Sequence, residues 1–154
     1  MTMLLYLAAV TAGFVAPNPG GGIIMTDIEL SEWHPSMRLV LDLETGRYVI
    51  RPTAAKWPKG EVRPDPRHGT LAGEALHKVR ALFGIAMDAG VANESCVKAD
   101  GKGFPGIVSN ASVPRLSLEA GERRIAAPAM YECWTSAADG LQQALTETFD
   151  GKTP

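Results

Sequence analysis

Alternation of apolar and polar side chains predicts two β-hairpins. In residues 38–43 three leucines fall on one face, and the alternation resumes in residues 47–51 after the turn residues Glu44-Thr45-Gly46. A second pair of alternating runs, residues 115–118 and 124–127, flanks Glu119-Ala120-Gly121-Glu122. Because successive strand side chains point to opposite faces and a Gly-containing turn lets the chain reverse, each pair is expected to form a hairpin.

Two shorter alternating runs predict further strands. Residues 27–33, with Ile28 and Leu30 on one face, are typical of a short edge strand. Residues 107–109 are expected to begin another strand.

Apolar residues spaced three and four apart predict two helices, over residues 70–89 and 133–149. Thr70 is a candidate N-cap for the first, and Gly90 and Gly151 follow the two helices as stop signals. The predicted core stripes are Ala72, Leu76, Val79, Phe83 and Ala86 in the first helix, and Trp134, Ala138, Leu141, Leu145 and Phe149 in the second.

The order hairpin, helix, hairpin, helix favours an α+β fold. Antiparallel hairpins need no crossover helix, so we predict an antiparallel sheet with both helices packed on one face. A chain of 154 residues is the usual size of one domain, which we expect to comprise residues 23–154.

The first 22 residues differ from the rest of the chain. Residues 3–15 carry no charge and are too few to span a bilayer, as in the apolar region of a signal peptide. Cleavage after Ala12 would leave a flexible Gly/Pro segment, residues 17–22, before the domain. We therefore predict a leader, a periplasmic or secreted mature chain, and no transmembrane helix in that chain. No Lys or Arg precedes the apolar run, so a buried element of a cytoplasmic protein, or translation from Met25, stays open.

The two cysteines, Cys96 and Cys133, predict a disulfide if the chain is exported. The bridge would close a loop of about 38 residues, which the chain-entropy model values at about 4 kcal/mol. In a cytoplasmic protein both would be thiols, and Cys133 at the start of a helix would be a candidate nucleophile.

Composition limits the class of function. Apolar residues make up 45% of the chain and charged residues 21%, as in an ordinary globular domain. The formal net charge of −2 argues against a nucleic-acid partner, because such proteins are usually basic overall.

The charge is nevertheless uneven. Residues 52–69 contain four prolines and predict a long irregular surface loop, and residues 47–80 hold eight Lys and Arg residues against three acidic ones. We therefore predict a binding surface for a protein or an anionic envelope component. Its candidate residues are Lys56, Trp57, Lys59, Arg63 and Arg67. A loop held rigid by prolines would also suit an inhibitor.

An enzymatic alternative rests on His68, His77 and Glu74, which could form a hydrolase site if they converged. Solvated polar residues on an exposed face are the favoured explanation of these three residues. Residues 100–103 (Asp-Gly-Lys-Gly) lack the remaining residues of a phosphate or calcium loop.

We predict a non-enzymatic exported binding module with no cofactor or metal. The alternatives are a small hydrolase and a cytoplasmic protein with free thiols.

Overall fold

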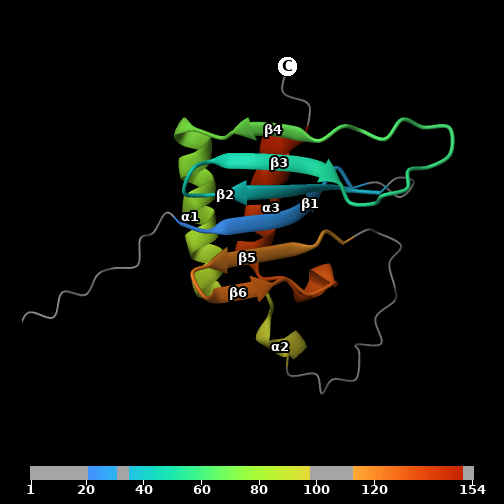
Figure 1. The fold of residues 1–154 in the computed structure, drawn as a ribbon. Coiled ribbons are helices and arrows are strands. Elements are labelled where there is room, and N and C mark those ends of the chain that lie inside the picture. The colour runs from blue at the N-terminus through green and yellow to red at the C-terminus, as the bar shows by residue number, and fades with distance from the viewer. Residues whose placement is uncertain (1–20, 31–34, 98–112, 151–154) are drawn as a thin grey trace, which may run out of the picture.

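The computed structural model describes residues 21–30, 35–97 and 113–150, and these form an α+β fold (Figure 1). The strands are β1 (Ile23–Ile28), β2 (Met37–Asp42), β3 (Arg47–Pro52), β4 (Arg67–Thr70), β5 (Leu116–Ala120) and β6 (Arg123–Ala126). The helices are α1 (Gly73–Ala89), α2 (Glu94–Val97), the 3₁₀ turn η1 (Tyr131–Cys133) and α3 (Ser136–Phe149).

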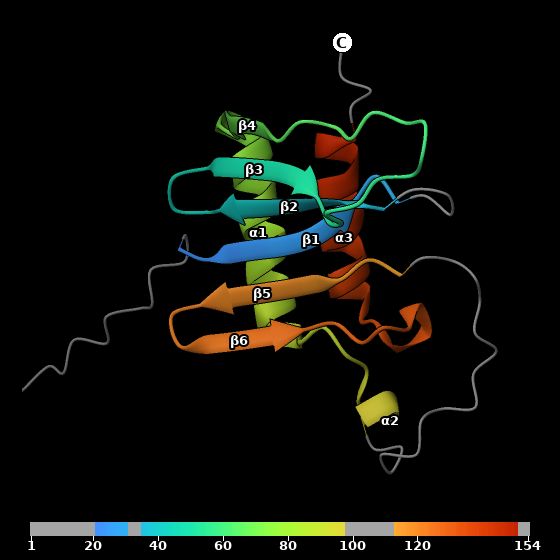
Figure 2. The same ribbon diagram turned by 45° about the vertical axis from the view of Figure 1, so that its right-hand side comes forward.

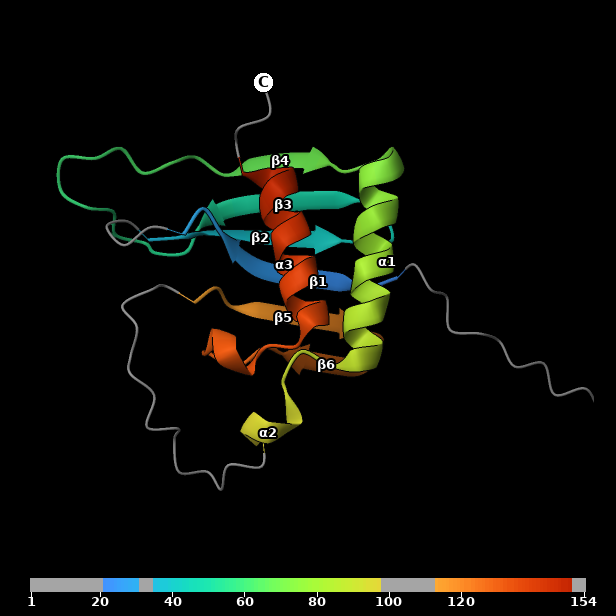
Figure 3. The same ribbon diagram turned by 180° about the vertical axis from the view of Figure 1, so that it is seen from behind.

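The strands form one antiparallel sheet in the order β4-β3-β2-β1-β5-β6. Helices α1 and α3 lie across the same face of this sheet (Figure 3). The predicted fold class and the packing of both helices on one face are therefore confirmed. Among the described helices none is long and apolar enough to cross a bilayer.

The core lies between the sheet and the two helices. Register places Leu39 between Thr26 and Ile50, and Ile24 opposite Leu118, so inward-facing side chains align across four strands. The largest buried side chains from the sheet are Ile24, Ile28, Leu39, Leu41, Leu116 and Leu118, and those from the helices include Val79, Phe83, Leu141, Leu145 and Phe149. The helical stripes predicted from spacing are buried, apart from Ala72, which is exposed and precedes α1.

Both helices begin later than predicted. Thr70 ends β4 and does not cap α1, whose N-cap is Ala72 without a side-chain hydrogen bond. Gly90 follows α1 at φ 80°, as expected of a residue that ends a helix. Helix α3 starts after Thr135, because the Thr135 hydroxyl accepts a hydrogen bond from the Ala138 amide at 3.2 Å. The predicted start at Cys133 was wrong, since that residue ends η1.

The strand predictions for the segments that form β1 and β4 also need correction. The central strand β1 runs over Ile23–Ile28 rather than 27–33, because its pairing with β2 and β5 sets its bounds. It buries Thr26 and Asp27, so local alternation does not reveal it. Strand β4 covers the last three residues of the predicted loop 52–69 and continues to Thr70, and its residues Arg-His-Gly-Thr contain no apolar side chain. The predicted strand over 107–109 and the leader up to residue 20 lie outside the described residues.

The second face of the sheet is open among the described elements (Figure 1). Register aligns one row of outward side chains across all six strands: His68, Val49, Val40, Met25, Ser117 and Ala126. A row of charged residues lies on each side of this row. One includes Arg51 and Arg38, and the other includes Asp42 and Glu119.

Candidate functional site

The connection between β3 and β4, residues 53–66, contains most of the predicted binding residues. This β3–β4 loop extends past the end of the sheet (Figure 1, Figure 2). Its base is fixed to the start of β2, since Thr53 donates from its amide to the Ser36 carbonyl at 2.9 Å and from its hydroxyl to the same oxygen at 2.8 Å.

Three contacts within the loop restrict its conformation. Trp57 is half-buried and packs against the hydrophobic core. The Glu61 amide donates to the Pro58 carbonyl at 3.1 Å across Gly60, whose φ of 92° suits glycine. Arg63 Nε donates to the Ala54 carbonyl at 3.3 Å. The loop is therefore anchored at its base and along one side.

The predicted residues do not contribute equally to an accessible surface. Lys56, Lys59 and Arg63 are exposed, as predicted. Arg67 belongs to β4 and forms an ion pair with Glu29, which compensates its charge. Trp57 serves chiefly to attach the loop to the core. Glu61 and Asp65 offset two of the loop's three cations, so its net charge is small.

Val62 was not among the predicted residues, although it is the most prominent apolar group of the loop. Its side chain is 92% exposed, compared with 54% for Ile85 on α1. It lies between Glu61 and Arg63 in a segment without hydrophobic periodicity, so a pattern search does not select it. The available signal is a β-branched residue in a stretch otherwise composed of Pro, Gly and charged residues.

The structure does not bring the three residues of the hydrolase hypothesis together. His68 pairs with Val49 in register and therefore belongs to the open face. Glu74 and His77 lie on α1, which covers the opposite face. All three residues are exposed. Within the ranges that the structure describes, no three His, Cys, Asp or Glu residues form a group able to hold a metal ion.

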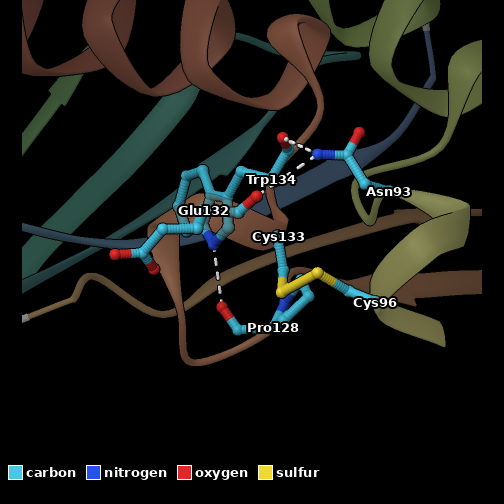
Figure 4. Close-up of a disulfide and its surroundings, with 6 residues drawn as sticks. All are labelled: Asn93, Cys96, Pro128, Glu132, Cys133 and Trp134. Carbon is cyan, nitrogen blue, oxygen red and sulfur yellow. Dashed lines mark hydrogen bonds between the residues drawn. A yellow bond between two sulfur atoms is a disulfide. The ribbon is translucent and has the colours of Figure 1, made fainter. Parts of the chain in front are cut away.

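Cys96 and Cys133 are joined in a disulfide, with 5.7 Å between their Cα atoms (Figure 4). The bridge connects α2 to η1, and Asn93 supports the same junction. The backbone N–H of Asn93 donates to the Cys133 carbonyl at 2.8 Å, and its side-chain Nδ2 donates to the Trp134 carbonyl at 2.8 Å. The Trp134 indole donates to the Pro128 carbonyl, also at 2.8 Å. In this structure Cys133 is therefore a cross-link and not a thiol nucleophile.

The sequence of the β3–β4 loop and the exposure of its side chains in the structure thus both indicate this loop as the candidate functional site. No protein-family model, curated protein or solved structure matches the chain.

Proposed function

We propose that the chain is a non-enzymatic binding module that acts outside the cytoplasm and engages a protein partner through the β3–β4 loop. The observation that carries this proposal is Val62, a branched apolar side chain held almost fully in solvent at 92% exposure. An apolar group presented in this way gains from burial against a partner, by about 1.5–3 kcal/mol for a valine-sized or larger side chain.

The anchoring of the loop favours recognition with little ordering cost. Thr53 fixes the base to Ser36, and Trp57 packs on the core. Binding loses less conformational entropy when the loop is already held near its bound geometry. The partner that fits is a protein with an apolar depression for Val62 and acidic groups near Lys59 and Arg63.

Export is part of the proposal because of the disulfide. Bridges of this kind form and persist in oxidising compartments. The Cys96–Cys133 bridge supports a periplasmic or secreted location, in keeping with the uncharged N-terminal run of residues 3–15.

Site-specific photo-cross-linking in the host cell tests this function. One variant is Val62→p-benzoylphenylalanine and its matched control is Ile85→p-benzoylphenylalanine, because both positions are exposed apolar residues on different parts of the fold. We expect a discrete protein adduct from position 62 and none from position 85. The yield of this adduct should fall when Lys59→Glu and Arg63→Glu are added, since these substitutions reverse the charge on either side of Val62. The proposal is wrong if position 62 gives no adduct, or if both positions give the same one.

A further inference from the structure

A pocket on the open face of the sheet lies apart from the β3–β4 loop. It has a volume of about 450 Å³ and is lined by parts of β1, β2, β5 and β6 and by the chain on either side of the β5–β6 hairpin. Pockets that hold small organic ligands commonly have volumes of about 300–1,000 Å³. We call it the arginine pocket, because Arg38, Arg115 and Arg124 line it and, among the residues that the structure describes, no acidic residue does.

The three arginines differ in the charge that they present. Arg38 is held by the buried carboxylate of Asp27, with Nη2 2.7 Å from Oδ1, so its charge is compensated. Arg115 and Arg124 are exposed. In the described part of the chain the ion pairs involve Asp27 with Arg38 and Glu29 with Arg67. Neither Arg115 nor Arg124 takes part in these ion pairs, although Glu119 lies directly opposite Arg124 in the β5–β6 register. Arg115 therefore carries the larger share of the excess positive charge at the pocket.

The remaining lining is largely apolar. Met25 lies in the outward row of the sheet, and Val113, Ala126 and Pro128 border the same space. A guanidinium binds a planar or tetrahedral anion through several parallel N–H donors. Apolar lining with a few convergent charged groups is the usual composition of a site for an amphipathic ligand.

A second hollow, of the reverse charge, borders the arginine pocket. It is lined by Asp42, Glu44 and Glu119 and by glycines, and Glu119 is the register partner of Arg124 in the β5–β6 hairpin. Because like charges repel, an anion on this face is disfavoured at the acidic hollow, and Arg115, four residues before Glu119 in the sequence, is the less compensated of the two arginines.

We propose that the arginine pocket binds a small amphipathic organic anion, whose carboxylate or phosphate group contacts Arg115 and Arg124 and whose apolar part lies against Met25 and Pro128. No residue of the β3–β4 loop lines the pocket, so this site is additional to the proposed protein-binding surface.

The test uses 8-anilinonaphthalene-1-sulfonate, a fluorescent amphipathic anion, with N-phenyl-1-naphthylamine as its uncharged counterpart. The variants are Arg115→Gln and Arg124→Gln, and the matched control is Arg123→Gln. Arg123 is also exposed and adjacent in β6, but it does not line the pocket. We expect saturable binding of the sulfonate with one site per chain. Either pocket variant should weaken it about tenfold or more, the loss typical of one charge-assisted hydrogen bond, and Arg123→Gln should not.

A second readout locates the probe. The Trp134 indole N–H donates to the carbonyl of Pro128, a lining residue, whereas Trp57 lies in the β3–β4 loop. The indole resonance of Trp134 should shift on titration and that of Trp57 should stay in place. Octanoate and octyl phosphate should both displace the probe, and 1-octanol at the same concentration should not. Their relative strength then identifies the preferred anionic group.

Four results would overturn the assignment: no saturable binding, equal loss in Arg123→Gln, equal binding of the uncharged counterpart, or displacement by 1-octanol. Loop variants such as Val62→Asp should leave probe binding unchanged, so failure of the pocket and failure of the loop proposal are separately visible.

Discussion

Arg38 donates a hydrogen bond from Nε to Oδ1 of Asp27 at 2.8 Å, and its Nη2 lies 2.7 Å from the same oxygen as an ion pair. The second oxygen accepts from the Arg115 amide at 3.2 Å. Asp27, at 5% exposure, thus connects β1 to β2 and to the segment that enters β5. The same contact holds one guanidinium at the arginine pocket.

We expect Asp27→Ala to lower the free energy of unfolding by about 2 kcal/mol, below the usual cost of breaking a fully buried pair because the Arg38 side chain is 23% exposed. Urea unfolding of Asp27→Ala, Arg38→Ala and the double variant measures the coupling. The double variant should be more stable than the sum of the single losses predicts. Additive losses would show that the pair contributes nothing as a pair.

A buried polar contact joins α3 to β1. Gln142 accepts from the Thr26 hydroxyl and donates to the Asp27 carbonyl at 3.0 Å, and both side chains are buried. Gln142→Ala leaves the Thr26 hydroxyl without this partner and should cost about 1–3 kcal/mol of unfolding free energy. The neighbouring Gln143→Ala is the control, since Gln143 is exposed and should change stability by about 0.5 kcal/mol or less. Equal effects at the two positions would contradict this account.

The disulfide should supply a large share of the stability. It closes a loop between residues 37 apart in sequence. Loss of the bridge in the double variant Cys96→Ser and Cys133→Ser is expected to cost about 4 kcal/mol. Reductant should lower the urea midpoint of the native chain and leave that of the double variant unchanged. A native midpoint that is insensitive to reductant would mean that the bridge does not stabilise the fold.

Hydrogen bonds in the turn between β2 and β3 are expected to make the stability of the fold sensitive to acid. Asp42 accepts from the Thr45 hydroxyl and the Glu44 amide, each at 2.8 Å. The Thr45 hydrogen bond, aided by the backbone amides of Glu44 and Thr45 and by the charge of Arg47, lowers the pKa of Asp42 from 3.8 despite slight desolvation. A lowered folded-state pKa gives stability that is present above pH 3.8 and lost as the pH falls through the folded value.

Asp42→Asn should therefore lower stability at neutral pH and flatten the stability profile below pH 3.8. Thr45→Ala removes the main cause of the shift and should change the profile in the same direction. Thermal unfolding from pH 2 to pH 7 measures both, and a profile of Asp42→Asn parallel to that of the native chain would refute the contribution.

Much of the fold follows from local pattern. The alternation around Leu39 and Leu41 and the spacing of Leu141 and Leu145 predict their elements, because burial of one face imposes the pattern directly. β4 has no apolar side chain, and β1 contains the buried polar residues Thr26 and Asp27, so pairing with neighbours defines both strands.

The candidate sites are less visible in the sequence. Lys56, Lys59 and Arg63 follow from the charge and proline content of their segment. Val62 emerges only from its exposure. Arg38 and Arg124 line one pocket although β1 and β5 separate their strands, a juxtaposition that the sequence pattern does not encode.

Export and the disulfide are tested together by the intact mass of the chain, expressed with its own N-terminus in its host and alkylated with and without prior reduction. We predict a chain shortened near Ala12 that takes up two alkyl groups only after reduction, at Cys96 and Cys133. A chain of full length with both thiols alkylated before reduction would contradict export, and would place the protein with free thiols in the cytoplasm.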